Sequence, residues 1–411
     1  MNVLESRDVL RPAASRTKRA LMAFVMAQLP TVFRLLRAVW PIPRIGNVVA
    51  ATRYDDVREV LLNDAAFGVP YKPQLDVIMG GQPFFLGMGD TPQYRADAAA
   101  MHRVMLRDDI SARLAPAVEA QAEVIVRRSG GRLEVVDDLV RRVAFDVLGD
   151  YFGVPNPPDG DLRVWATRLF EFQFVDHGPS IRAEVDEIAP ALRRHIQNEI
   201  ERRRAAGEGK DDLLGRCLRM QAMGEPGFSD DQIRTSLMGF VVGGPPQPPM
   251  VVPQALEQLL RRPEALAGAQ AAASKGDDQL LAGYIFEAMR FDPLAPALPR
   301  EALADCTIAA GTAREHKVPK GATVLAAISS AMMDERRVPE PRSFNPRRLP
   351  HEYMHFGYGL HTCFGSHINQ AVLPLMLKPL LKRTELRRAP GPDGRLRKRG
   401  AFADILWVQY S

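Results

Sequence analysis

The sequence is poor in cysteine. Only Cys217, Cys306 and Cys363 occur among 411 residues. An odd and sparse set argues against a disulfide framework and favours a reducing compartment. Because no two of these cysteines are close in sequence, a structural zinc site is not expected either. We therefore expect a cytoplasmic protein.

The sequence also lacks a long run of uncharged apolar residues. The most apolar N-terminal stretch, Ala20 to Trp40, contains Pro30 and carries Arg34 and Arg37. A membrane span needs about 20 nearly uncharged residues, so we expect a chain that does not span a membrane. The late start of the stretch and the lack of a cleavage site argue against a secretory signal. We predict that residues 1–40 form an N-terminal extension with an amphipathic helix, which packs on the body or rests on another surface.

A strong charge of one sign is absent as well. The net charge is +5, and the basic residues are mostly arginines scattered along predicted helices. Without a basic stripe with interleaved aromatics, nucleic acid is not an expected partner. A local basic face for an acidic protein partner stays open.

Most of the chain has apolar residues at helical spacing, and 46% of its residues are hydrophobic. We predict a mainly α fold with a minor β component, in one domain covering residues 1–411. The predicted helices lie in 55–62, 112–127, 137–152, 192–204, 233–242, 256–262, 278–290 and 368–381, and the predicted strands in 47–52, 306–309 and 322–328. Ser229 to Gln232 has the form of a capping box before the helix at 233–242.

The segment from Phe67 to Thr91 is rich in glycine and proline, which predicts a long loop, and long structured loops are usually functional. Within it, residues 71–88 include Phe84 and Phe85. Together with residues 170–175 they are predicted to line a pocket for an apolar small molecule. The competing interpretation is that several of these aromatics belong to the ordinary core.

One glycine-rich stretch surrounds a single cysteine. It reads FGYGLHTCFG over residues 356–365, and a predicted helix follows. Glycine permits positive φ and a close approach of backbone to a flat ligand, and backbone N–H groups near a helix N-terminus stabilise a thiolate. From chemistry alone, Cys363 is a buried structural thiol, a nucleophile or a metal ligand.

The complete stretch resembles the haem-binding loop of the cytochrome P450 family, F-x-x-G-x-H-x-C-x-G, at every fixed position. The resemblance extends over nearly the whole chain and implies the P450 fold with haem b as cofactor. It implies that Cys363 is the iron ligand, that Phe356 shields the sulfur, that Gly357 and Gly365 give room to the haem, and that His361 reaches a haem carboxylate.

Other landmarks resemble the same family. Glu287 and Arg290 correspond to its E-x-x-R, and Arg348 corresponds to the second arginine of that set, which implies a structural brace. Arg300 stands where relatives place a basic residue against a haem propionate; the alternative is an ordinary surface arginine.

The chain departs from the family in its central helix. Relatives that activate dioxygen carry A/G-G-x-D/E-T-T, whose acid and hydroxyl supply protons. Here residues 243–249 read GGPPQPP, which places Pro246 at the acid and Gln247 at the first threonine. Four prolines do not fit a regular helix interior. We predict that the helix breaks near Gly244, resumes around Pro249, and leaves free carbonyls toward the distal haem pocket. The competing interpretation is a plain loop between two helices.

A second departure lies after Asp90. Relatives often use H-x-x-x-R to contact a propionate, but Tyr94 and Ala98 occupy those positions. Tyr94 itself, Arg95 and His102 are the candidates for this contact, with Arg103 as a further alternative.

Three functions follow from these features. The favoured one is a haem-thiolate enzyme that acts on a hydroperoxide or peroxide, such as a fatty-acid hydroperoxide, with Gln247 and the neighbouring Gly243, Gly244 and Pro246 over the haem. The second is a conventional monooxygenase with a ferredoxin-type electron donor. The third is a haem protein for binding or sensing, with little catalysis.

Overall fold

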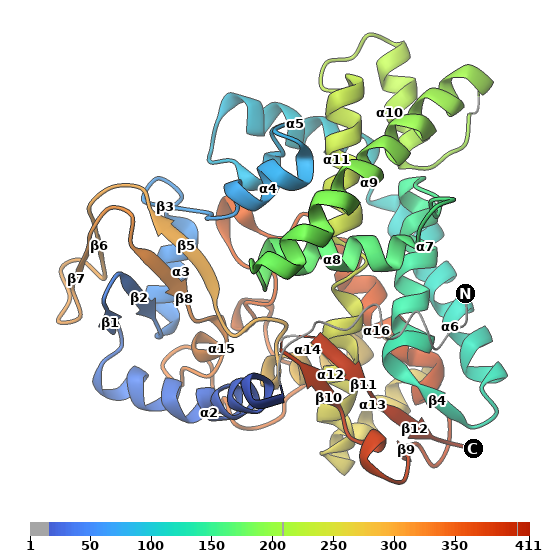
Figure 1. Ribbon diagram of the computed structural model, residues 1–411. Helices are drawn as coiled ribbons and strands as arrows, with labels where there is room; N and C mark the ends of the chain where they lie inside the picture. Colours follow the sequence, from blue (N-terminus) through green and yellow to red (C-terminus); the bar gives the residue numbers. More distant parts are fainter. Residues whose placement is uncertain (1–15, 208, 401) are drawn as a thin grey trace. The chain divides into compact units, whose positions relative to one another are not determined.

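The computed structural model describes residues 16–207, 209–400 and 402–411, with side chains from Gln28 onward (Figure 1). Residues 1–15, which belong to the predicted N-terminal extension, lie outside the described residues. Helices dominate and the strands are short, so the predicted mainly α class with a minor β component is confirmed. The described chain forms two compact units, residues 71–128 with 136–249, and residues 16–70 with 129–135 and 250–411. One domain over residues 1–411 stays a prediction.

The first unit is helical. Its long helix α11 packs against α7, α8 and α9. The bounds of its elements are α4 Lys72–Met79, η1 Phe85–Gly87, α5 Pro92–Val104, η2 Ile110–Leu114, α6 Ala115–Arg128, η3 Val135–Arg141, α7 Arg142–Phe152, α8 Leu162–Phe174, α9 Pro179–Ala206, α10 Leu213–Ala222 and α11 Asp230–Gly243, of which η3 takes its first residue from the second unit.

The predicted capping box begins α11. The Ser229 hydroxyl accepts a hydrogen bond from the Gln232 backbone N–H, and the Gln232 side chain accepts one from the Ser229 backbone N–H. These bonds satisfy N–H groups that a helix start leaves free. Residues 233 and 235–242 are then buried, so α11 is an interior helix of its unit.

The prediction of one long loop from Phe67 to Thr91 was wrong in part. Helix α4 lies inside it and ends at Gly80, whose φ of +68° closes the helix in the left-handed conformation. Helical spacing in Leu75, Ile78 and Met79, which are buried, was hidden by the surrounding glycines and prolines.

Within the described residues, the second unit contains all strands and the remaining helices. Its main sheet has the order β1-β2-β8-β5-β3. The helices are α2 Arg16–Val39, α3 Tyr54–Leu62, α12 Pro248–Leu260, α13 Pro263–Lys275, α14 Asp278–Phe291, α15 Ile328–Ala331, η4 Pro350–Glu352, η5 Gly359–His361, α16 Ser366–Leu381 and η6 Pro392–Gly394, of which α12 takes its first two residues from the first unit. The strands are β1 Arg44–Ile45, β2 Val48–Ala51, β3 Phe67–Gly68, β4 Arg132–Glu134, β5 Leu298–Ala302, β6 Cys306–Ile308, β7 His316–Val318, β8 Thr323–Ala326, β9 Arg387–Arg388, β10 Arg397–Arg399, β11 Phe402–Ile405 and β12 Trp407–Gln409.

Strand β5 fixes the position of Arg300. It pairs antiparallel with β8, so that Arg300 lies opposite Val324, and β8 in turn pairs parallel with β2. The core beneath this sheet is formed by β-branched and small residues of β2 and β8 together with Val57, Val60 and Leu61 of α3. Arg300 is therefore a buried residue of a strand that is paired on both sides, with β3 and with β8.

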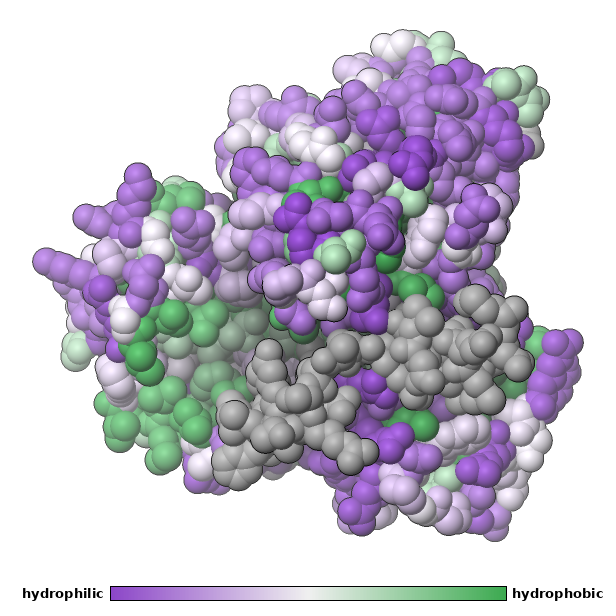
Figure 2. Space-filling model, in the orientation of Figure 1, coloured by the Kyte–Doolittle hydropathy of each residue, from purple (hydrophilic) through white to green (hydrophobic). Residues whose placement is uncertain are grey.

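Helix α2 runs through Pro30 without ending there. Its C-terminal half and the following strands expose Val32, Leu35, Val39, Trp40, Ile45 and Val48. Figure 2 shows apolar residues gathered in the region where Figure 1 draws α2 and β1. Among the described helices, none is long and apolar enough to cross a bilayer.

Candidate functional site

The loop around Cys363 is closed on itself by backbone hydrogen bonds. The Cys363 N–H donates to the Phe356 carbonyl at 2.8 Å, and the Cys363 carbonyl accepts from the Ser366 N–H at 3.0 Å. Gly357 and Gly359 have φ of +70° and +71°. A Cβ atom on Gly359 would lie 2.8 Å from the Leu61 carbonyl oxygen, so the loop needs glycine there.

Two N–H donors face the Cys363 sulfur. They are the backbone N–H of Gly365 and the side-chain amide of Asn369, whose Nδ2 lies 3.9 Å from Sγ. Burial raises the pKa of the thiol, and these two hydrogen bonds oppose the rise. A metal cation bound to the sulfur would add the charge that a buried thiolate requires. The donor set therefore fits a haem iron.

Sequence reasoning missed Asn369. It lies in the first turn of α16, six residues after the cysteine. Its amide nature was visible in the sequence, but only the helix start at Ser366 brings it back toward the sulfur. A polar residue in the first turn after a ligand loop is the signal that would have identified it.

Arg300 and His361 lie close together in the second unit. Burial and then the positive charge of Arg300 lower the pKa of His361 to about 4. Arg300 is buried, and its Nη1 donates to the Pro299 carbonyl at 3.0 Å. Two neighbouring nitrogen donors of this kind suit a ligand carboxylate, so both residues fit a haem propionate.

The Glu287, Arg290 and Arg348 side chains form one buried ion-pair network. The Glu287 Oε1 lies 2.7 Å from Nη2 of Arg290 and 3.0 Å from Nε of Arg348. Burial raises the pKa of Glu287, but the hydrogen bonds and charges of these arginines and the Asn345 N–H together hold it below its ordinary value. The network ties α14 to the segment before the cysteine loop, which suits a structural brace.

Sequence reasoning missed two members of this network. The Asn345 backbone N–H donates to Glu287 at 3.0 Å, and the Tyr353 hydroxyl donates to it at 3.3 Å. A backbone donor leaves no side-chain signal in a sequence. The brace is therefore larger than three residues.

The central helix is interrupted, as predicted. Helix α11 ends at Gly243 and α12 begins at Pro248, one residue before the expected point. The predicted free carbonyls are wrong in part. The Gly243 carbonyl accepts from the side-chain amide of Gln247, and the Gly244 carbonyl accepts from the Gln247 backbone N–H at 3.2 Å. Glutamine thus fills acceptors that the missing helical N–H groups leave open.

Gly243, Gly244 and Pro246 lie in or beside this interruption. Apart from the backbone of its own helix, a Cβ atom on Gly243 would meet nothing within 4 Å, whereas one on Gly244 would lie 2.8 Å from the Phe240 carbonyl oxygen. Pro246 is buried and Gln247 is half-buried. No residue of 243–249 has an acid or a hydroxyl group.

The aromatic residues of the first unit gather around Phe240 of α11. Phe84, Phe85 and Phe152 have ring centroids 6.4, 6.2 and 5.9 Å from that of Phe240. In the segment 170–175, Phe170 and Phe172 are buried, while Phe174 and Val175 are exposed. Phe84 and Phe85 thus lie in an apolar cluster beside the helix that carries the interruption.

The residues that follow Asp90 are placed apart from one another. Arg95 forms a bidentate ion pair with Asp90 at 2.6 and 2.7 Å, and Arg103 pairs with Glu225 at 2.6 Å. The Tyr94 ring lies 6.2 Å from that of Phe85, and His102 is exposed. Both arginines thus have surface partners within the first unit, and Tyr94 packs with the aromatic cluster.

Comparison with known proteins identifies a family. The family model "Cytochrome P450" matches residues 168–405. A steroid C26-monooxygenase of Mycolicibacterium smegmatis is 28% identical over 360 residues, covering 85% of this chain and 84% of the relative. A bifunctional dioxygenase–epoxy alcohol synthase of Pyricularia oryzae is 25% identical over 394 residues, covering 85% of this chain.

The chain spans only 34% of the Pyricularia protein and 63% of the Streptomyces venezuelae monooxygenase PikC, to which it is 24% identical. Among solved structures, CalO2 has a TM-score of 0.79 at 21% identity, covering 95% of this chain and 97% of that chain. The chain belongs to the cytochrome P450 family of oxidoreductases, whose cofactor is haem b.

Proposed function

We propose that this chain is a haem-thiolate enzyme that rearranges an apolar hydroperoxide, with Cys363 as the iron ligand. The observation that carries this proposal is the segment 243–249, which has no acid or hydroxyl and whose Gln247 amide is bound to the Gly243 carbonyl. When bound, the haem supplies the iron that cleaves an O–O bond. The chain supplies the pocket and the groups around it.

The missing proton relay agrees with this reaction. An unsaturated hydroperoxide and an epoxy alcohol are isomers, so their interconversion consumes no electrons and no net protons. Proline has no proton to give, and a carboxamide is a poor relay because it has no accessible pKa. A segment built from glycine, proline and glutamine is therefore compatible with isomerisation and poorly suited to dioxygen activation by the usual acid and alcohol.

Gln247 is the proposed positioning group. One N–H of its amide closes the interruption through Gly243, and its other N–H and its Oε1 have no hydrogen-bond partner within the described chain. These atoms are proposed to orient the substrate peroxide. The two relatives whose names include epoxy alcohol synthase, each 25% identical to this chain, support a hydroperoxide substrate.

The proposed cofactor contacts follow the geometry of the second unit. Gly365 and Asn369 donate to the Cys363 sulfur. Phe356 is proposed to shield the sulfur, and Gly357 and Gly365 are proposed to give room to the haem. His361 and Arg300 are proposed to hold one propionate. Tyr94, Arg95 and His102 stay candidates for the other, although the ion pair of Arg95 with Asp90 makes it the weakest of the three.

The test supplies the holoenzyme with a linoleic acid hydroperoxide labelled with ¹⁸O at both peroxide oxygens, without reductant. We expect rapid turnover to an isomer that keeps both labels. Gln247→Ala is expected to lower the rate or change the product. The matched control is Gln254→Ala, because the Gln254 amide also donates to the carbonyl four residues earlier, at 2.6 Å, but lies outside 243–249.

A conventional monooxygenase is the second candidate, and the 28% identity to a steroid C26-monooxygenase over nearly its full length favours it. It requires turnover with NAD(P)H, a ferredoxin, its reductase and dioxygen. Turnover under those conditions alone, with none from the hydroperoxide, would reject the isomerase.

A further inference from the structure

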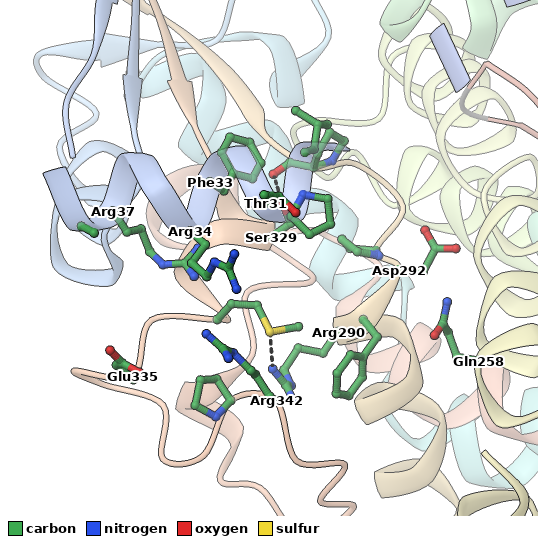
Figure 3. A pocket seen from close by; sticks show the side chains of 18 of the residues that line it. Thr31, Phe33, Arg34, Arg37, Gln258, Arg290, Asp292, Ser329, Glu335 and Arg342 are labelled. Atoms are coloured by element: carbon green, nitrogen blue, oxygen red, sulfur yellow. Dashed lines mark hydrogen bonds between the residues drawn. The ribbon is translucent and has the colours of Figure 1, made fainter. Parts of the chain in front are cut away.

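A pocket of about 530 Å³ lies in the second unit, and none of its lining residues belongs to the cysteine loop. Its walls come from the C-terminal half of α2, the ends of α12 and α14, and the segment that follows α15. In Figure 3, Arg34 and Arg37 extend from α2 and Arg342 from the opposite wall toward the same space. This volume is in the usual range for a small-molecule site.

The lining is strongly cationic. Seven of its residues are arginines, and only Asp292 and Glu335 are acidic. Three of the arginines, Arg261, Arg290 and Arg336, are paired with carboxylates of the chain at 2.7–2.9 Å. Asp292 is itself paired with Lys398 at 2.8 Å, which leaves Glu335 as the available acid.

The other four arginines have no carboxylate within ion-pair distance among the described side chains. They are Arg34, Arg37, Arg262 and Arg342. Arg262 instead donates to the Gln258 carbonyl and side chain, and its guanidinium lies 4.3 Å from the centre of the Phe291 ring. Four guanidinium charges that lack a carboxylate at ion-pair distance lie around one cavity and repel one another, so the pocket favours an anion.

Arg37 makes this argument strongest. The residue is 9% exposed, and its Nη1 donates to the neutral Ser330 hydroxyl at 2.8 Å. Burial lowers the pKa of Arg37. The charges of Arg336 and Arg342 also lower it, whereas the charges of Asp334 and Glu335 raise it. A buried guanidinium without a paired anion is costly, and a bound anion would remove that cost.

The charge and the walls together select a ligand class. Arg34 and Arg37 are three residues apart and share one face of α2, and Arg342 adds a third guanidinium. A phosphate monoester carries nearly two negative charges and three acceptor oxygens, which suit several guanidinium groups, whereas a monocarboxylate compensates only one charge. Phe33, Phe291 and Met333 line the remaining space and suit an apolar body.

We propose that this pocket binds a small organic phosphate, a phosphate monoester with an apolar or aromatic body, through Arg34, Arg37 and Arg342. This site is separate from the proposed reaction and does not depend on it.

Calorimetric titration of the holoenzyme with 1-naphthyl phosphate tests the proposal. We expect one equivalent to bind, and Arg342→Gln or Arg34→Gln to weaken it by roughly tenfold, as expected when a charged hydrogen-bond donor is lost. The matched control is Arg347→Gln, an exposed arginine five residues after Arg342 that does not line the pocket, and it should leave binding unchanged. Glu335→Gln removes the one available acid and should strengthen binding by about threefold.

Several results would overturn the proposal. Equal weakening by Arg347→Gln would indicate general attraction to a basic surface. If inorganic phosphate binds as tightly as naphthyl phosphate, the pocket does not recognise an organic body. If 1-naphthoate binds equally tightly, the pocket does not require a phosphate group. If sodium chloride at matched ionic strength gives the same calorimetric signal, the heat reflects ionic strength and not binding at a specific site. Circular dichroism and the Soret band of each variant confirm that it is folded and holds haem.

Discussion

The cysteine loop at 356–365 and the interruption at 243–249 are both rich in glycine, but they serve different requirements. In the cysteine loop, Gly357 and Gly359 have positive φ, and Gly359 has backbone of α3 against its α-carbon. In the interruption, neither Gly243 nor Gly244 has positive φ, and the chain is closed by a side chain, that of Gln247. The loop that would hold the cofactor is thus fixed by backbone geometry, while the segment that would guide the reaction is free to differ in side-chain chemistry. If these assignments hold, cofactor binding and reaction chemistry are determined by two different segments of the chain.

The largest expected effect comes from Cys363→Ser. A hydroxyl is a poor soft ligand, so we expect loss of haem, or loss of the red-shifted Soret band that reduced haem-thiolate proteins show with carbon monoxide. Cys306→Ser, at a half-buried cysteine of β6, is the control and should keep the spectrum. If Cys363→Ser keeps the thiolate spectrum, Cys363 is not the iron ligand. The cysteine loop would then not be the cofactor-binding region, and the comparison between the two regions would fail.

The brace beneath the loop gives the next largest effect. Arg348→Ala would leave Glu287 buried with one partner fewer, and breaking a buried ion pair costs about 3–5 kcal/mol of unfolding free energy. Arg347→Ala, its exposed neighbour, should change this free energy by less than about 0.5 kcal/mol. Urea unfolding of the two holoenzymes measures the difference. Similar values for both would mean that the network does not stabilise this unit.

These two regions also show how far sequence reasoning reaches. Helix α11, its capping box and the interruption followed from local signals, namely Ser229, Gln232 and the clustered prolines. The hydrogen bond from the Gln247 amide to Gly243 did not, because a glutamine side chain has no fixed direction until the backbone around it is known. Helix α4 was missed because glycines and prolines on both sides hid its short apolar period.

The cysteine loop and the Glu287 ion-pair network could be recognised for a different reason. A fixed spacing of glycine, histidine and cysteine is a property of the sequence itself, and so is the spacing of Glu287 and Arg290. Asn369 was missed because its contact with the sulfur depends on where α16 begins, and the Asn345 N–H was not predictable because it is a backbone group. The cationic pocket was beyond reach, because its arginines come from segments up to about three hundred residues apart and only the fold assembles them.

A pH effect of intermediate size distinguishes the two regions. His355, just before the loop, hydrogen-bonds to the Phe286 carbonyl at 3.0 Å, and burial lowers its pKa to about 4. Between pH 6.5, the ordinary pKa of histidine, and pH 4, His355 takes up a proton in the unfolded chain but not in the folded chain. Unfolding free energy should therefore fall on acidification, by up to about 1.4 kcal/mol per pH unit from this group.

His355→Phe should reduce that slope, measured by urea unfolding at several pH values from 7 to 5. The exposed His351 gives the control, and His351→Phe should leave the slope unchanged. Because the segment 243–249 has no titratable side chain, replacements within it should leave the slope as it is in the unmodified protein. If the slope in His355→Phe equals that of the unmodified protein, the pH-sensitive group lies elsewhere, and His361 is the next candidate.

The smallest effect separates the two glycines at the end of α11. A Cβ atom on Gly244 would lie 2.8 Å from the Phe240 carbonyl oxygen, so Gly244→Ala must displace backbone, and we expect a loss of roughly 1–3 kcal/mol. Apart from the backbone of α11 itself, a Cβ atom on Gly243 would have open space within 4 Å. Gly243→Ala should then stabilise the fold by about 0.4–1 kcal/mol, because alanine restricts the unfolded chain. Thermal unfolding of both variants measures the sign of each change.

If both variants lose stability equally, steric contact does not explain the Gly-Gly pair, and the interruption would depend on backbone freedom as the cysteine loop does. If only Gly244→Ala loses stability, the contact of Gly244 with the Phe240 carbonyl determines where α11 ends. The side chains of residues 245–247 could then differ, as the reaction requires, without moving the end of the helix.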